Sequence, residues 1–183
     1  MSEVFTNAGA RTAGISANQI RGTRYNRVVH GVYTTGDAND TVTLAQAALM
    51  VSPPGSVLGG FTVLRFLGVE LPDDITDDQR IQVVVPPGVF GPQRPQIKVT
   101  RSPLVLPPID LGDGLLGVHP AQAWLQVSCD MPADDVTALA QQLMSASPPL
   151  ATRAQLLQVL DALPGRRCTK LARRALRQVG WDT

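Results

Sequence analysis

Three arginines near the N-terminus have the residue type and spacing that suit binding to a polyanion. Arginine neutralises phosphates, and the release of condensed counterions supplies most of the sequence-independent affinity for DNA. The segment just before them is rich in polar side chains, and asparagine, glutamine and arginine can make paired hydrogen bonds to base edges. The candidate DNA contacts of this region are Ser16, Asn18, Gln19, Arg21, Arg24, Arg27 and His30.

A second group of cations crowds the last predicted helix, where Arg166 and Arg167 precede a regular pattern. Four cations are spaced i, i+3, i+4 and i+7, which places them on one helix face, opposite Leu171, Ala175, Leu176 and Val179. This basic stripe predicts further phosphate contacts. The alternative is an ordinary solvated helix face, because arginines near a helix C-terminus also interact favourably with the helix dipole. The stripe residues are Lys170, Arg173, Arg174 and Arg177.

No residue pattern predicts catalysis. The sequence has no G-x-S-x-G, no phosphate-binding loop and no dinucleotide-binding motif. His30 and His119 are its only histidines, and we interpret them as a surface residue and a helix-start residue. An acidic run lacks the spacing of a calcium loop and is interpreted as a solvated loop; its residues are Asp73, Asp74, Asp77 and Asp78. We therefore expect a protein that acts by binding, with no catalytic residues, no metal and no cofactor.

Composition is consistent with a folded domain. Hydrophobic residues make up 44% of the 183 positions, which is enough to build a core without stabilising disulfides or metal sites. No apolar run approaches a membrane span, and the N-terminus lacks the basic start and apolar block of a signal peptide. The chain is therefore expected to be cytoplasmic. Cys129 and Cys168 lie far apart with no C-x-x-C motif, and we interpret them as free, buried or half-buried thiols.

Periodicity predicts an α+β fold. Two short helices are expected over residues 5–13 and 16–24, followed by a hairpin that turns at Gly31. Apolar helices are predicted over 41–51, capped by Thr41 or Thr43, and over 56–69, where Gly59 and Gly60 indicate close packing of the backbone. Strands follow at IQVVVPP, PQIKVTRS and LLGVHP, and a helix with Trp124 buried begins at Pro120. The last helices span DDVTALAQQLM, a segment opened by a Thr152–Gln155 capping box, and RRCTKLARRALRQV.

These segments together resemble the AbiEi-type antitoxin family of actinobacterial type IV toxin-antitoxin systems, over nearly the whole chain. The resemblance is carried by the Ser16–Arg24 helix, RVVHGVYTT, PPGSVLGGFTVLRFLG, IQVVVPP, IKVTRS, VHPAQAWLQV and ALPGRR. It implies a winged helix-turn-helix, here compressed, over residues 1–37, an antitoxin core of helices and a sheet over 40–150, and a basic C-terminal helical pair over 151–183. Many members continue into an endonuclease-like domain, which this chain would lack.

The chain also departs from the family pattern. One short helix precedes the expected recognition helix, and the dense basic run that usually follows that helix is missing. After Pro120, relatives often carry Arg, Thr and Asp where this chain has Gln122, Ala123 and Gln126, so we expect the polar network of that turn to be lost.

The resemblance implies a DNA-binding antitoxin or repressor-like protein. Its winged helix would bind double-stranded operator DNA, and its core would neutralise a nucleotidyltransferase-type toxin. The alternative is a non-catalytic protein-interaction module, such as a phage or prophage accessory or defence protein, without DNA binding. A third interpretation, a nuclease remnant, has the least support from the motifs.

Overall fold

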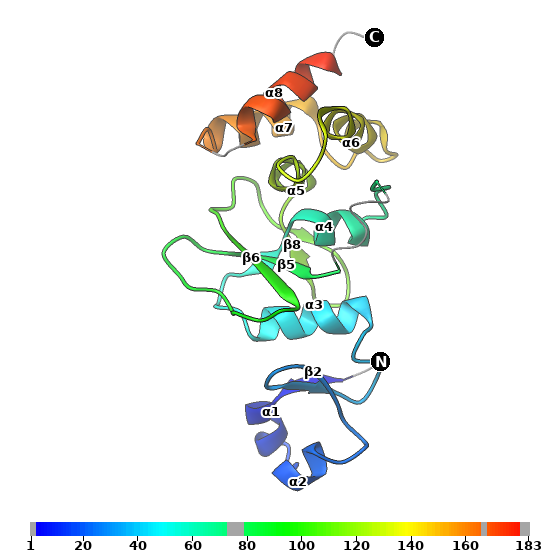
Figure 1. Cartoon of the computed structure of the whole chain (residues 1–183), viewed down its shortest axis with the longest axis vertical. Coiled ribbons are helices and arrows are strands. Elements are labelled where there is room, and N and C mark those ends of the chain that lie inside the picture. Colours follow the sequence, from blue (N-terminus) through cyan, green and yellow to red (C-terminus); the bar gives the residue numbers. More distant parts are fainter. Residues whose placement is uncertain (1–2, 73–78, 166–167, 180–183) are drawn as a thin grey trace.

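A computed structural model describes residues 3–72, 79–165 and 168–179. The chain is α+β, as the periodicity predicts, and its elements are stacked along one long axis (Figure 1). A small N-terminal unit lies at one end. A five-stranded sheet occupies the middle, and a group of helices forms the other end. No helix among the described residues is long and apolar enough to cross a membrane.

The N-terminal unit combines a three-stranded antiparallel sheet with two short helices. Its elements are β1 (Val4–Thr6), α1 (Asn7–Thr12), α2 (Ala17–Ile20), β2 (Asn26–Val29) and β3 (Val32–Thr34), with strand order β1-β3-β2. The predicted hairpin is confirmed, and Gly31 at its turn has a φ of +86°. The helix predicted from residue 5 is wrong at its start, because Phe5 and Thr6 belong to β1 and pair with Tyr33 and Val32. The second helix is shorter than predicted, since it ends at Ile20.

Helix α3 (Thr41–Met50) separates the two sheets. Its N-cap is Asp40, whose carboxylate accepts a hydrogen bond from the Thr43 backbone N–H at 2.9 Å, so the predicted threonine caps are wrong. Ala45 and Ala48 are buried in the main core, whereas Ala47 packs with the valines of β2 and β3. Because alanine is small, both the N-terminal sheet and the central sheet can approach this helix closely.

The central sheet has the strand order β6-β5-β4-β8-β7. Strands β5 and β6 are parallel, with Ile81 opposite Ile97, and every residue of β5 is buried. The three predicted strand segments are confirmed, but the helix predicted over 56–69 is wrong at its start, where two residues form β4 and pair with β5. The strands are β4 (Val57–Leu58), β5 (Ile81–Val85), β6 (Ile97–Arg101), β7 (Ile109–Asp110) and β8 (Leu116–Gly117).

Gly59 and Gly60 stand at the start of α4 (Gly60–Phe66), not inside a longer helix. The predicted close packing is confirmed, because a Cβ on Gly59 would lie 2.5 Å from a methyl group of Val84. Gly60 has a φ of +49°, and a Cβ there would collide with the Gln82 amide. A residue with a Cβ would be strained at this positive φ and would displace the Gln82 side chain, whereas glycine avoids both costs.

Gly60→Ala should therefore lower the free energy of unfolding by at least about 1 kcal/mol, from the left-handed backbone alone. Chemical denaturation measures the loss. The matched control is Gly165→Ala, because Gly165 has open space around its Cβ position and no positive φ; it should stay within about 0.5 kcal/mol of wild type. Equal midpoints for the two variants would contradict the assignment.

Four helices complete the core: α5 (Pro120–Val127), α6 (Ala133–Ser145), α7 (Arg153–Ala162) and α8 (Thr169–Gln178). The predicted burial of Trp124 is confirmed, and so is the capping box at Thr152. One apolar cluster runs from Ala45 in α3 to Leu176 in α8. The C-terminal helical pair therefore shares its core with the sheet.

A disulfide joins Cys129, at the end of α5, to Cys168, just before α8. The interpretation of the two cysteines as free thiols is thus wrong. They are 39 residues apart in sequence, and the packing of both α5 and α8 against α6 and α7 brings their Cα atoms to 5.1 Å. Sequence spacing contains no signal for such a pair.

Two glutamines of α5, which stand where relatives often carry Arg and Asp, make hydrogen bonds of their own, as does Gln82 of β5. Gln126 Oε1 accepts a hydrogen bond from Gly60 N at 2.8 Å, and Gln82 Oε1 accepts one from Phe61 N at 3.1 Å. These amides satisfy backbone N–H groups at the start of α4, which has no side-chain cap of its own. Gln122, fully buried, accepts from Val105 N and donates to the Pro103 carbonyl. The glutamines thus replace a helix cap and fasten the chain between β6 and β7.

Candidate nucleic-acid interface

The N-terminal unit has an excess of positive charge. Residues 3–36 contain four arginines and one glutamate, a net charge of +3. All four arginines are exposed, and none forms an ion pair with an acidic side chain in the part of the chain that the structure describes. Such unpaired guanidinium groups are available to phosphates. They are Arg11, Arg21, Arg24 and Arg27.

Helix α2 is held by its own cap. Ser16 Oγ accepts a hydrogen bond from Gln19 N at 3.3 Å, and Gln19 Oε1 accepts one from Ser16 N at 2.7 Å. These two predicted DNA contacts therefore have a structural role in this structure, because the capping box engages their acceptor atoms. Asn18 on this helix and Arg21 at its C-cap are exposed, and the side chains of both lack a hydrogen-bond partner within the described ranges.

Arg11 and Arg21 line a common cleft of about 240 Å³ between α1 and α2. Asn7 and Tyr33 add polar groups to its wall, and no acidic residue lines it. Two guanidinium groups without a carboxylate between them suit a phosphate. Arg11 was not among the predicted contacts, because only the turn at residues 13–16 places α1 next to α2.

The β2–β3 hairpin contributes the remaining predicted contacts of this unit. Arg27 is exposed on β2, and His30 is exposed at the turn. The guanidinium carbon of Arg24 lies 5.8 Å from the Tyr25 ring centroid. The Tyr25 ring in turn packs edge-on against Phe5, with centroids 5.4 Å apart. This aromatic pair packs β1 against the residue just before β2. It therefore helps to fix the positions of Arg24 and Arg27.

Only part of the basic stripe on α8 is available to contact phosphates. Lys170, Arg174 and Arg177 are exposed, but Arg173 Nη2 donates to Asp161 Oδ1 at 2.6 Å and to the Leu160 carbonyl at 3.3 Å. Arg173 therefore joins α8 to α7. Arg166 and Arg167 lie outside the described residues.

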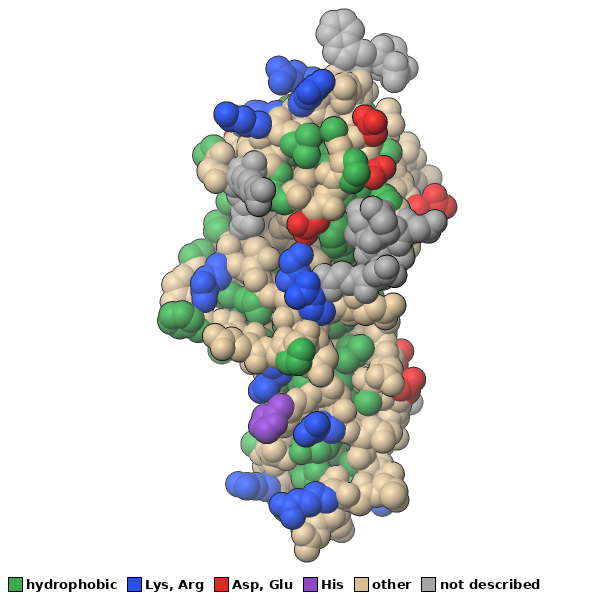
Figure 2. Space-filling model, in the orientation of Figure 1, with side chains coloured by type: hydrophobic (Ala, Val, Ile, Leu, Met, Phe, Trp, Pro, Cys, Tyr) green, Lys and Arg blue, Asp and Glu red, His purple; other side chains and the backbone are tan. Residues whose placement is uncertain are grey.

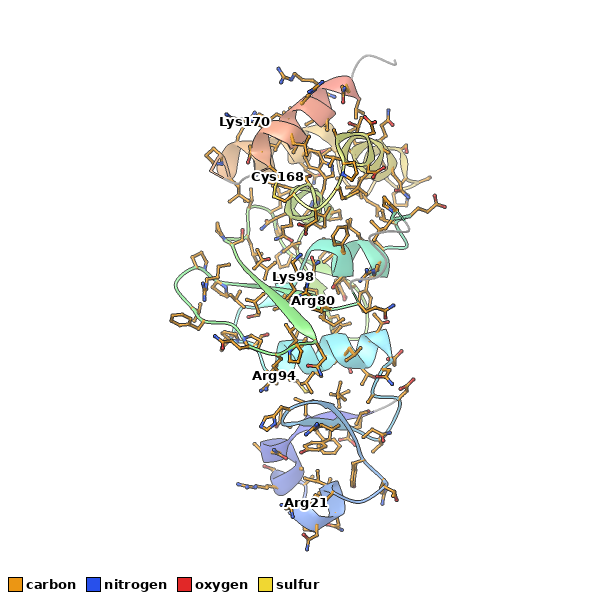
Figure 3. All side chains as sticks on the ribbon, in the orientation of Figure 1. Arg21, Arg80, Arg94, Lys98, Cys168 and Lys170 are labelled. Carbon is orange, nitrogen blue, oxygen red and sulfur yellow. A yellow bond between two sulfur atoms is a disulfide. The ribbon has the colours of Figure 1, made fainter. Side chains whose placement is uncertain are left out.

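The two predicted basic groups do not meet. Arg21 and Lys170 lie at opposite ends of the long axis (Figure 3). Figure 2 shows lysine and arginine side chains at both ends of this face, over the N-terminal unit and over α8, and also across its middle. A ligand that contacted both groups would have to span the molecule. The structure therefore favours the N-terminal unit as a site in its own right.

His119 has a structural partner. As predicted, it stands at the start of a helix: its Nδ1 accepts a hydrogen bond from Ala121 N at 3.2 Å and caps α5. Burial lowers the pKa of this imidazole below its ordinary value, because desolvation disfavours the charged ring. A neutral ring is also what the cap requires.

Within the described ranges, no group of three or more histidine, cysteine, aspartate or glutamate side chains could hold a metal ion. The acidic run Asp73, Asp74, Asp77 and Asp78 lies outside those ranges. No model of a known protein family matches the sequence, and no curated protein is significantly similar to it.

Proposed function

We propose that the chain is a DNA-binding protein of the antitoxin or repressor type, whose N-terminal unit binds operator DNA. The observation that carries this proposal is the set of four exposed, unpaired arginines on a unit with a single acidic residue. Counterion release from DNA requires such a surface.

The order of elements supports a compressed winged helix-turn-helix. In this interpretation α1 and α2 form the helix-turn-helix, α2 enters the major groove, and the β2–β3 hairpin is the wing. Asn18, Arg21 and Arg24 would face base edges, while Arg27 and His30 would follow the backbone. Arg11 would hold a phosphate in the cleft that it shares with Arg21.

The neutralisation of a nucleotidyltransferase-type toxin remains part of the proposal through the family resemblance. The core from α3 to α8 would provide that contact, because the N-terminal unit would be occupied by DNA. On a duplex long enough to span the molecule, the C-terminal stripe would add sequence-independent phosphate contacts through Lys170, Arg174 and Arg177.

Arg21→Ala and Arg24→Ala should each weaken binding to a duplex from the protein's own promoter by roughly 5- to 150-fold, the range for a lost base contact. The ratio of operator to random-duplex affinity should also fall. Replacing Lys170, Arg174 and Arg177 together by alanine should weaken binding to both duplexes about equally and reduce the slope of log affinity against log salt by about 0.9 per lost phosphate contact. Fluorescence anisotropy at several salt concentrations measures both effects.

The matched control is Arg153→Ala, an exposed arginine on α7 outside both basic groups, which should bind like wild type. If wild-type protein shows no salt-dependent binding to any duplex from its locus at about 50 mM salt, the DNA proposal fails. The protein-interaction module would then be the better interpretation.

A further inference from the structure

The connection between β5 and β6 presents the most exposed large apolar side chain of the described residues. Phe90 is 82% exposed. The chain around β6 projects to one side of the stack of elements (Figure 1). Exposure of a phenylalanine ring to water is unfavourable. A ring that is exposed on a projecting loop therefore indicates a binding site.

Several contacts hold the backbone of this loop against the sheet. Gly91 lies so close to the sheet that a Cβ there would be 2.5 Å from a methyl group of Val99. Val89 is fixed from two directions: its N–H donates to the Pro86 carbonyl at 3.4 Å, and its carbonyl accepts from Arg101 Nε at 3.0 Å. These contacts position the backbone on both sides of Phe90, which reduces the entropic cost of ordering the ring when a ligand binds.

Arg101 also covers one face of the Phe90 ring. Its guanidinium carbon lies 5.0 Å from the ring centroid, a cation–π contact. Because the side chain is still 82% exposed, the other face of the ring is open to a planar partner.

The surrounding segment is basic. Residues 79–109 contain four cations and no aspartate or glutamate: Arg80, Arg94, Lys98 and Arg101. Lys98 pairs with Asp130 at 2.9 Å, so part of its charge is neutralised. Arg94, in contrast, has a buried Nε without a hydrogen-bond partner among the described residues. Arg80, Arg94 and Lys98 all lie over the middle of the face drawn in Figure 3. Because this Nε has almost no exposed surface, a phosphate would contact the part of the half-buried Arg94 side chain that remains exposed.

We infer that Phe90, Arg94 and Arg101 form a contact site for single-stranded nucleic acid, separate from the N-terminal unit. A base stacks on the open face of Phe90, and the flanking phosphates meet Arg94 and Arg101. A duplex fits less well, because its bases are stacked on each other and present no free face. A protein partner also fits less well, since protein interfaces need about 800 Å² of buried surface per partner around an apolar centre, and next to Phe90 the loop adds only Val89, which is 36% exposed, as a large apolar side chain.

The test uses a fluorescein-labelled dT20 oligonucleotide and a random 20-base-pair duplex as probes at about 50 mM salt. Wild type should bind dT20, and Phe90→Ala should weaken that binding by roughly 5- to 150-fold, the range for one stacked base. Arg94→Ala should lower the salt slope by about 0.7, the value for one phosphate of a single strand. Leu157→Ala, which truncates an exposed apolar side chain on α7, is the control and should bind like wild type.

Phe90→Trp supplies a direct signal. It should retain binding, and stacking of a base on the indole should quench the added fluorescence relative to the wild-type baseline. Unchanged fluorescence with saturating dT20, or equal dT20 binding by wild type and Phe90→Ala, overturns the inference. A loss in Phe90→Ala that is as large for the duplex as for dT20 also overturns it and identifies a duplex contact instead.

The two proposals fail separately. The duplex site of the N-terminal unit is tested by Arg21→Ala, which should leave dT20 binding nearly unchanged. Phe90→Ala should in turn leave duplex binding nearly unchanged.

Discussion

Trp124→Ala should lower the free energy of unfolding by roughly 3 to 5 kcal/mol, the usual cost of truncating a buried tryptophan. Trp124 is 0% exposed, and its Nε1 donates to the Val136 carbonyl at 3.0 Å. The substitution would therefore leave a cavity between α5 and α6 and would remove a hydrogen bond that joins the two helices. Chemical denaturation followed by circular dichroism measures the loss.

Two further variants serve as comparisons for Trp124→Ala. Trp124→Phe keeps most of the ring volume but lacks the donor, so it should lose less stability than Trp124→Ala. Leu157→Ala removes an apolar side chain that is 39% exposed and should stay within about 1 kcal/mol of wild type. A denaturation midpoint for Trp124→Ala equal to that of wild type would mean that the indole does not fill the core.

Reduction of the Cys129–Cys168 disulfide should lower the free energy of unfolding by roughly 4 kcal/mol, because opening a loop of this length restores chain entropy to the unfolded state. The two cysteines are 39 residues apart and enclose α6 and α7. The measurement compares denaturation of the oxidised protein with and without a phosphine reductant.

Cys129→Ser is the matched control for the reductant. Its stability should equal that of the reduced wild type and should not change between oxidising and reducing buffers. The oxidised wild type, once denatured, should not react with a thiol reagent until reductant is added. Immediate reaction of both cysteines in air-oxidised protein would show that the bond does not form.

The disulfide also bears on the expected cytoplasmic location. Disulfides persist in oxidising compartments and are rare in the cytosol. If the chain resides in the cytosol, its cysteines will be reduced there and its stability will be the lower of the two values. The ends of α5 and α8 would then be kept near each other only by the packing of both helices against α6 and α7, to which buried side chains such as Ala172 and Leu176 contribute.

Local features could be read from the sequence. The Thr152–Gln155 capping box, the turn at Gly31 and the helical burial of Trp124 were predicted correctly, because caps, turns and amphipathic faces depend on residues within a few positions of each other. The apolar segments of β5 and β6 were also recognisable. In the same way, the positions of the basic residues along the chain were enough to separate them into two groups, one in the N-terminal unit and one on α8.

Features that join distant residues depended on the tertiary structure. Strands β1 and β4 have three and two residues, too few for a periodic pattern, and they exist because Val4 pairs with Thr34 and Val57 with Val84. The disulfide has the same origin. The candidate sites follow this rule as well: the Arg11–Arg21 cleft requires α1 to fold next to α2, and the contact between Phe90 and Arg101 requires a loop to return along β6. Caps, turns and amphipathic faces are determined by residues close together in sequence. Short strands, the disulfide and the candidate sites are determined by the packing of residues that are far apart in sequence.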